Sequence, residues 1–290
     1  MQRFFKIIIG SVFVVTIFLY IESNCIEVSR HSIHSSKIPD SFLGFKILQL
    51  TDLHSKSFGK DNQRLIKKIK KINPDIIVAT GDMLNSQNDQ GLVFLNLAAQ
   101  LTPKYKILYI VGNHEQIARI HANKMNFNWY TEYIQKLKKL GVIVLEDEKA
   151  IINKNNEQII IYGLEIPLMY YSEAGTPMQV EFSEKYLINH LEENDRKKFT
   201  ILLVHTPLYF SSYVNWGSDL IFAGHMHGGI IRLPFLGGVL SPERDYFPEY
   251  DGGKYELENS TMVVGRGLGN YTINLRIFNR PELMVVTLDH

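Results

Sequence analysis

The chain has 290 residues, of which 45% are hydrophobic and 21% are charged, and its formal net charge is +1. This composition is typical of a globular protein with a sizeable core, and the length allows one large α/β domain plus an appendage. The near-neutral charge argues against bulk electrostatic capture of nucleic acid, so no nucleic-acid partner is expected. Because Cys25 is the only cysteine, disulfide frameworks and cysteine metal clusters are excluded.

An apolar run opens the chain. Arg3 and Lys6 precede residues 7–21, which are almost all apolar. A helix over residues 4–21 would rise roughly 27 Å, just enough for the hydrocarbon core of a bilayer. We interpret residues 1–22 as a signal anchor, because the run is followed by a poor cleavage site and lacks the polar stripe of a core helix. A cleaved signal peptide and a buried core helix are the alternatives. The basic residues favour a single-pass protein of the cell membrane whose main domain is extracytoplasmic.

Residues 23–44 are polar and include Pro39, which favours a connector over a helix. Residues 45–290 are expected to form one domain, and its first half alternates between two hydrophobic periodicities. Strands are expected over residues 46–51, 75–80 and 106–111, with helices over residues 62–72 and 91–101 between them. This alternation predicts βαβ units and a parallel sheet.

The second half of that domain is expected to add a second sheet. Helices are predicted over residues 128–140 and 182–191, and strands over residues 142–145, 150–152, 158–162, 200–204, 220–223, 261–264 and 283–287.

Short polar motifs follow five of these strands. They are Asp52-Leu53-His54, Gly81-Asp82, Gly112-Asn113-His114-Glu115, His205 and Gly224-His225-Met226-His227. Ligands bind beyond the carboxyl ends of parallel strands, so the first three motifs are expected at one sheet edge. Asp and Asn are also common turn formers, but that explanation is weak for three consecutive strands followed by two histidine motifs.

The donor chemistry of these motifs indicates a metal site. Leaving His114 aside, they supply two Asp, one Asn and four His, enough for two adjacent divalent cations with a shared ligand. A donor set without thiolate suits Mn²⁺, Fe or Zn²⁺ in a site open to water. Such a pair of cations can clamp the attacking and leaving oxygens of a phosphoryl displacement.

Together the motifs resemble those of the calcineurin-like metallophosphoesterase superfamily. The apolar N-terminus and the tail segments Gly265–Gly269 and Arg276–Glu282 are similar to its bacterial membrane-anchored branch. The resemblance implies an α/β fold, namely a four-layer αββα sandwich of two mixed sheets, with an N-terminal transmembrane helix. Residues 45–290 would then be the catalytic domain.

The resemblance also implies a role for each motif residue. One metal would be bound by Asp52, His54 and His227, the other by Asn113, His205 and His225, and Asp82 would bridge the two. A hydroxide shared by the metals would be the nucleophile. His114 would be catalytic, stabilising the transition state or protonating the leaving oxygen, with Glu115 placed to orient its ring. Arg266, between two glycines, is a candidate substrate contact.

The function implied is that of a metal-dependent phosphoric ester hydrolase. We expect it to cleave a phosphodiester or pyrophosphate bond in a lipid- or nucleotide-linked envelope substrate, with two divalent ions as cofactors and Mn²⁺ favoured over Fe or Zn²⁺. A phosphomonoesterase and a non-catalytic, metal-stabilised surface module are the alternatives. The complete ligand set beside His114 argues against the module. The substrate itself stays open, because one scaffold hosts many specificities.

Overall fold

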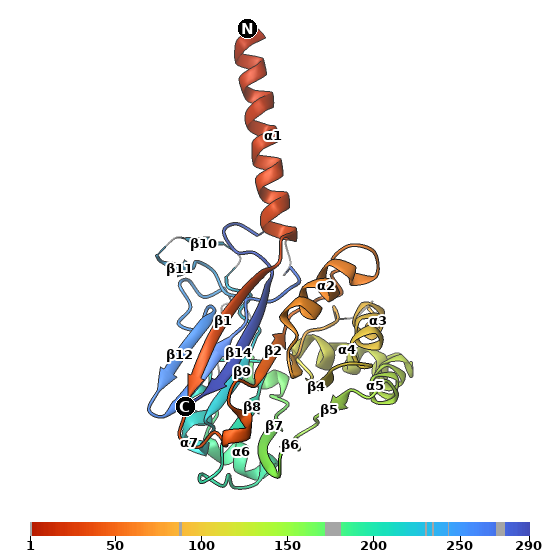
Figure 1. Ribbon diagram of the computed structural model, residues 1–290. Helices are drawn as coiled ribbons and strands as arrows, with labels where there is room; N and C mark the ends of the chain where they lie inside the picture. The colour runs from red at the N-terminus through yellow and green to blue at the C-terminus, as the bar shows by residue number, and fades with distance from the viewer. Residues whose placement is uncertain are drawn as a thin grey trace.

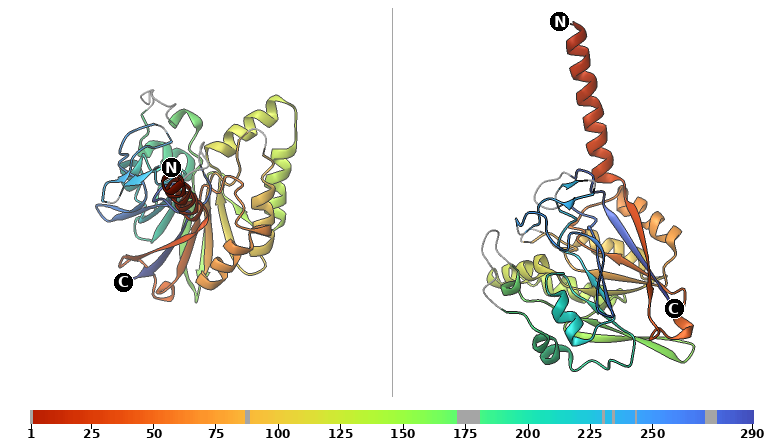
Figure 2. Two further views of the ribbon diagram at one scale, coloured as in Figure 1. Left: turned by 90° about the horizontal axis from the view of Figure 1, so that it is seen from above. Right: turned by 90° about the vertical axis from the view of Figure 1, so that its left-hand side faces the viewer.

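Two large β-sheets lie face to face, and helices cover the outer face of each sheet (Figures 1 and 2). The computed structural model describes residues 2–86, 89–171, 181–229, 231–233, 235–242, 244–270 and 276–290. Both sheets contain parallel and antiparallel neighbours. The expected four-layer α/β sandwich of two mixed sheets is therefore confirmed.

The first sheet has six strands, which in spatial order are β1 (Glu27–His34), β14 (Glu282–Asp289), β2 (Lys46–Leu50), β3 (Ile76–Thr80), β4 (Lys106–Ile110) and β5 (Ile143–Val144). Strands β2 to β5 are parallel to one another, as the βαβ pattern predicts. The layer of helices on this sheet consists of α2 (Gln63–Ile72), α3 (Leu92–Leu101), α4 (Asn113–Lys124) and α5 (Trp129–Lys139).

The second sheet also has six strands, in the order β12 (Gly253–Leu257), β13 (Ser260–Val264), β9 (Leu220–Ala223), β8 (Thr200–Leu203), β7 (Glu157–Gly163) and β6 (Glu148–Lys154). Its outer face carries α6 (Glu184–Leu191) and α7 (Phe210–Trp216). Among the residues that the structure describes, the remaining elements are the two-stranded ribbon of β10 (Arg232–Leu233) and β11 (Gly237–Gly238) and three short 3₁₀ helices, Asp40–Phe42, Lys60–Asn62 and Leu168–Tyr170.

Side chains at successive positions of a strand point to opposite faces of the sheet, and this separates the core into layers. In β2, Ile47 packs between the two sheets while Leu48 packs under the helices of the first sheet. In β8, Ile201 packs between the sheets while Leu202 packs under α6 and α7. Because successive strand residues point to opposite faces, a central strand buried on both sides must be apolar throughout.

The segment expected to be a connector contains a strand. Residues 27–34 form β1, which pairs in parallel with β14 along its whole length. The sequence conceals this strand because most of its side chains lie at the solvent-exposed edge of the sheet, where polar residues are tolerated. The sheet of the domain therefore begins well before residue 45.

The N-terminal helix α1 (Gln2–Asn24) stands away from the sandwich (Figure 1). Within Arg3–Asn24, an 18-residue window has a mean hydropathy of 2.4, and none of that window is buried inside the protein. The alternative of a buried core helix is therefore wrong. By length and composition the helix could cross a membrane.

Strand direction places the motif-bearing edge at the α1 end of the domain. Strand β1 begins directly after α1 and runs away from it, parallel to β14. Strand β2 is antiparallel to β14, and β3 and β4 follow β2. The carboxyl ends of β2, β3 and β4 consequently point back toward α1.

A buried ion pair ties the start of β14 to the loop after β13. Glu282 is 4% exposed, and one of its carboxylate oxygens, Oε1, lies 2.8 Å from Nη2 of Arg266. The other oxygen accepts the Arg266 backbone N–H at 2.9 Å, and Ser29 of β1 also donates to this carboxylate. Burial would raise the pKa of Glu282, but the Arg266 charge and these hydrogen bonds outweigh it and hold the pKa below its ordinary value.

This pair predicts a defined loss of stability in acid. Because the folded-state pKa of Glu282 is lowered, its contribution is fully present above its ordinary pKa of 4.5 and is lost as pH falls through the folded-state value. Glu282→Gln should lower the free energy of unfolding by on the order of 2 kcal/mol at neutral pH. The variant should also lose less stability than the unmodified protein when the pH is lowered from neutral to acid. Urea unfolding of the detergent-solubilised chain across pH measures both effects. Parallel stability curves for the two proteins would contradict the assignment.

Candidate metal centre

The polar motifs of both sheets meet at one edge of the sandwich. From the first sheet, Asp52 and His54 follow β2, Asp82 follows β3, and Asn113 begins α4 after β4. From the second sheet, His205 follows β8, and His225 and His227 follow β9. The residues described include two triplets whose ligand atoms all lie within 4.8 Å of one another, Asp52 with His54 and His227, and Asp82 with His205 and His225. A third group by the same criterion, His54 with Asp82 and His114, connects these two triplets.

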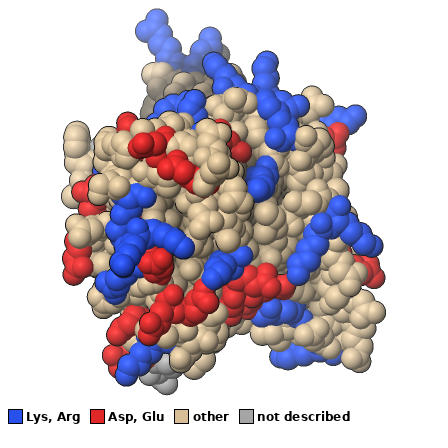
Figure 3. All heavy atoms as spheres, turned by 60° about the horizontal axis from the view of Figure 1, so that its bottom comes forward, with Lys and Arg blue, Asp and Glu red and all other residues tan. Residues whose placement is uncertain are grey.

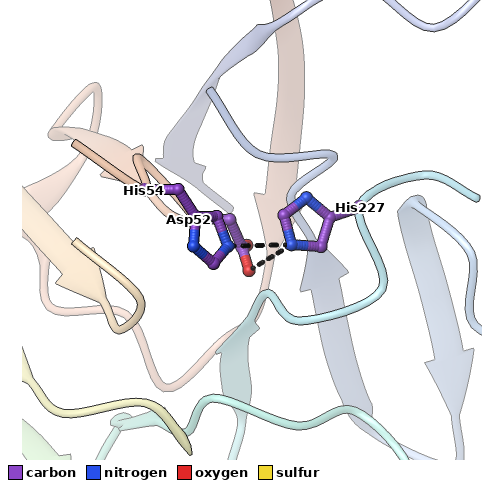
Figure 4. A group of neighbouring side chains, drawn as sticks. All are labelled: Asp52, His54 and His227. Carbon is purple, nitrogen blue, oxygen red and sulfur yellow. Dashed lines mark hydrogen bonds and ion pairs between the residues drawn. The ribbon is translucent and has the colours of Figure 1, made fainter. Parts of the chain in front are cut away.

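In the first triplet, two imidazoles face each other beside a carboxylate (Figure 4). Nε2 of His54 lies 3.1 Å from Nε2 of His227, which in turn lies 3.4 Å from Oδ1 of Asp52. Burial lowers the pKa of His54 to about 3 and that of His227 well below its ordinary value. Both rings are therefore neutral at pH 7, which is the form in which histidine binds a metal.

Asp82 belongs to the second triplet and also faces His54 of the first. Its Oδ2 is 3.2 Å from Nε2 of His205 and 3.8 Å from Nε2 of His54. Burial would raise the pKa of Asp82, but the charges of His205 and His114 hold it well below its ordinary value. Burial likewise opposes the charge on His205, yet the Asp82 carboxylate raises the pKa of that imidazole to about 10.

Hydrogen bonds to the backbone orient the ligand atoms. Nδ1 of His205 lies 2.7 Å from the carbonyl oxygen of Thr80 and donates to it, which turns Nε2 toward Asp82. The carboxylate of Asp52 accepts the backbone N–H of His225 at 3.1 Å and the hydroxyl of Thr51 at 2.7 Å. These contacts join the loops of the two sheets across the site.

The loops hold their side chains inward by means of unusual backbone geometry. Left-handed φ values between 44° and 69° occur at Asp52, His54, Asp82, His225 and His227. Such residues cost of order 1–3 kcal/mol each and concentrate at functional sites. Glycine makes the close approach possible, because a Cβ on Gly112 would collide with the Asp82 carboxylate and one on Gly224 with Thr51.

Asn113 presents an oxygen with no donor among the described residues. Its Oδ1 is buried and accepts no hydrogen bond from them. Leaving a buried carbonyl oxygen without a partner is costly in a protein interior. A cation would satisfy this oxygen, so the residue suits the ligand role expected for it.

His114 lies beside the triplets and remains partly exposed. Its backbone N–H donates to Oδ1 of Asp82 at 2.9 Å, and its ring packs edge-on against His54 with centroids 4.6 Å apart. Nδ1 of the ring lies 3.0 Å from the hydroxyl oxygen of Ser86. Ser86, not Glu115, therefore orients this ring.

The structure corrects the role expected for Glu115. Its carboxylate is fully buried and accepts backbone N–H groups from Gly112 and Asp82, both at 2.8 Å, and from Met83 at 2.7 Å and Leu84 at 3.3 Å. Burial, and then the nearby Asp82 charge, raise the pKa of Glu115 to about 7 despite these bonds. Glu115 thus positions the two loops, not the His114 ring.

Arg266 is held by carboxylates. Its Nη2 lies 2.8 Å from Glu282 and 3.0 Å from Oε2 of Glu27. This arrangement occupies the guanidinium in joining β1 and β14 to the loop after β13, and contact with a substrate stays a prediction. A second arginine, Arg276, is buried and donates to backbone carbonyls of the same loop, including those of Arg266 and Gly267.

Several supporting residues were not anticipated from the sequence. Thr51 and Ser86 contact candidate site residues, and Asn279 donates through Nδ2 to the carbonyl of His227 at 2.8 Å. Thr51 directly precedes Asp52, so its position next to a motif was a usable signal. Ser86 is an ordinary loop residue by sequence. Asn279 lies in the tail segment Arg276–Glu282, which the resemblance singled out without giving Asn279 a role, and only the fold brings both residues to the motifs.

Comparison with known proteins places the chain in a family. A family model described as calcineurin-like phosphoesterase matches residues 45–229. The metallophosphoesterase YkuE of Bacillus subtilis is 30% identical over 93% of this chain and 87% of its own length. The phosphodiesterase YaeI of Escherichia coli is 24% identical over 93% of this chain and 90% of its own length. The UDP-2,3-diacylglucosamine pyrophosphatase LpxG of Chlamydia muridarum is 22% identical over 92% of this chain and 90% of its own length.

The family match covers the loops that carry all seven candidate ligands, and the two triplets bring six of them together at one edge of the sandwich. The chain belongs to the calcineurin-like phosphoesterase family and is a metal-dependent phosphoester hydrolase.

Proposed function

We propose that the chain hydrolyses a phosphodiester or pyrophosphate bond of a membrane-associated substrate at a dinuclear metal centre. The observation that carries the proposal is the pair of ligand triplets, of which the second contains Asp82, whose carboxylate also lies 3.8 Å from Nε2 of His54 in the first. One cation would be held by Asp52, His54 and His227, the other by Asn113, His205 and His225, with Asp82 shared.

The spacing of the donor atoms supports this assignment. Two ligands about 2.1 Å from one cation at tetrahedral or octahedral angles are about 3.0–3.4 Å apart. The separations are 3.1 Å between His54 and His227, 3.4 Å between His227 and Asp52, and 3.2 Å between His205 and Asp82. A cation would also take the place of the proton that the Asp82 carboxylate favours on the His205 imidazole. Carboxylate, carboxamide and imidazole donors suit Mn²⁺, with Fe or Zn²⁺ as the alternatives.

The chemistry divides between the cations and the protein. When bound, two divalent cations supply an acidified water and neutralise charge on the phosphoryl group. His114 is placed to act on the substrate, because Ser86 engages Nδ1 and leaves Nε2 for a phosphoryl or leaving-group oxygen. The Glu115 carboxylate joins the loop of Asp82 to the loop that precedes His114, and the His114 backbone N–H donates to Asp82.

The substrate class is inferred from location and relatives. If α1 crosses the membrane with Arg3 and Lys6 on the cytoplasmic side, the domain lies outside the cytoplasm with its metal edge toward the bilayer. One relative is named as a pyrophosphatase of a diacylated nucleotide sugar and another as a phosphodiesterase. Both support an amphiphilic phosphodiester or diphosphate over a soluble monoester. The position of His114 beside the triplets disfavours a non-catalytic module.

Metal removal should abolish activity and reduce stability. The detergent-solubilised full chain should hydrolyse bis-p-nitrophenyl phosphate faster than p-nitrophenyl phosphate with Mn²⁺ present, and a chelator should stop both reactions. Cation at about 100 times its Kd should stabilise the fold by about 2.7 kcal/mol, which thermal unfolding with and without Mn²⁺ measures. A metal-loaded, folded protein that hydrolyses neither ester would argue against a general diesterase site.

His114→Ala should separate metal binding from turnover. We expect the variant to keep its metal content while its turnover falls by about 10²–10⁴-fold, the usual contribution of a general acid or base. Asp82→Asn should instead lose bound metal together with activity. His190→Ala serves as the matched control, because that histidine lies on the exposed surface of α6 and should change neither quantity. Metal analysis and steady-state kinetics on the same samples provide the readout. Equal loss of metal and activity in His114→Ala would refute its catalytic role.

A further inference from the structure

Four apolar side chains are exposed together near the end of the domain from which α1 emerges. Phe235 is fully exposed, and Leu236, Phe278 and Leu233 are 65%, 54% and 39% exposed. All four line one open cavity of about 690 Å³, together with Arg232, Glu249 and Asp251, and Arg232 forms an ion pair with Asp251. Single exposed apolar residues are ordinary on protein surfaces, but a contiguous group of this kind marks an interaction site.

The group comes from two adjacent loops, which we call the docking loops: residues 231–233 with 235–238, and residues 276–280. A β-bridge between Ile231 and Ile277 joins them, and the Arg232 N–H donates to the Ile277 carbonyl at 3.1 Å. The two loops are therefore joined into one surface. Figure 1 and the right-hand view of Figure 2 place the β10–β11 ribbon at the end of the domain from which α1 emerges.

Direct contacts connect the docking loops to α1. The Phe278 ring packs edge-on against Phe18 of α1, with centroids 5.3 Å apart. Nε of Arg280 lies 2.7 Å from Oε1 of Glu22, near the end of α1. Because Phe18 lies within the apolar span of α1, Phe278 lies at the depth of the last apolar turns of that span. A bilayer around α1 would meet the docking loops at its surface.

The opposite end of the domain differs in character. Figure 3, in which that end comes forward, shows Lys, Arg, Asp and Glu side chains scattered widely over the surface. Such a face is suited to water. Large apolar and aromatic side chains beside a membrane span are instead typical of segments that rest in the interfacial region of a bilayer.

We propose that the docking loops are a second membrane contact, in which Leu233, Phe235, Leu236 and Phe278 enter the bilayer surface beside α1. The inference rests on the membrane attachment of α1 proposed above. We assign phospholipid as the partner of these four side chains, because the contact of Phe18 with Phe278 makes them continuous with α1, the proposed membrane span.

The docking loops also contact the backbone of the proposed ligand loop. Asn279 donates to the carbonyls of His227 and Gly229, and Nη1 of Arg232 donates to the Gly228 carbonyl at 3.0 Å. Insertion of these loops would therefore hold the metal edge at the height of lipid headgroups. A phosphate attached to a lipid tail would reach that edge without leaving the bilayer.

Depth-dependent quenching tests the proposal on the full chain. The only cysteine, Cys25, is replaced by serine, and single cysteines are introduced as Val14→Cys in α1, Phe235→Cys, Leu236→Cys and Leu257→Cys. Each is labelled with an environment-sensitive NBD fluorophore in phosphatidylcholine vesicles. Leu257 is the matched control, since it is 39% exposed and ends β12 at the end of the domain away from α1 (Figure 1).

We expect the labels at positions 14, 235 and 236 to emit at shorter wavelength and to lose emission to doxyl-labelled lipids. The label at position 257 should respond only to aqueous iodide. Labels at 235 and 236 that behave like the one at 257, while 14 is quenched by lipid, would overturn the docking surface and leave the anchor intact. A label at position 14 that lipid does not quench would overturn both the membrane anchor and the docking surface.

Two further outcomes are informative. Protection of 235 and 236 from iodide that grows with the protein-to-lipid ratio, without lipid quenching, would assign the surface to a second copy of the chain and overturn the proposal. Failure of the proposed function is distinguishable, because depth quenching requires no turnover and hydrolysis of p-nitrophenyl esters requires no bilayer.

Discussion

The arrangement of the metal edge depends on one buried carboxylate. Glu115, in the first turn of α4, accepts backbone N–H groups from the loop after β3 and from the loop after β4. A carboxylate at a helix N-terminus is favoured by the unsatisfied amides and the helix dipole there. Here the same carboxylate also captures the amides of a neighbouring strand end. It thereby sets the distance between Asp82 and the residues Asn113 and His114 without contacting any of their side chains.

Around the Glu115 carboxylate, the site combines features that each destabilise the folded state. Five candidate ligands adopt left-handed backbone conformations, two buried imidazoles are kept neutral, and the oxygen of Asn113 has no donor among the described residues. Bound cations would offset these costs together, since they satisfy lone pairs that the protein leaves in place. The large apolar core between the two sheets makes such a strained edge tolerable, because it holds the strands from which every loop emerges.

Most of the fold could be predicted from local patterns, and the exceptions have physical reasons. The buried strands of both sheets and the main helices follow from periodicity, and the ligand motifs follow from the ends of strands. Strand β1 was missed because it is a polar edge strand, stabilised by pairing with β14 at the other end of the chain. Glu115 was expected to orient His114, but its amide partners on the loop after β3 lie about thirty residues earlier in the chain. No local pattern reveals that contact.

The sequence by itself determined the chemistry of this protein: which side chains can bind cations, which strands present them, and which segment can enter a membrane. These properties are local, because they depend on residue type and on spacing along a few turns or one strand. Only the tertiary structure decided the partners. It joined Arg266 to Glu282 and Glu27, gave Ser86 to His114, and brought the docking loops beside Phe18. Those contacts link residues that are distant in the chain, and their geometry exists only once the two sheets have packed.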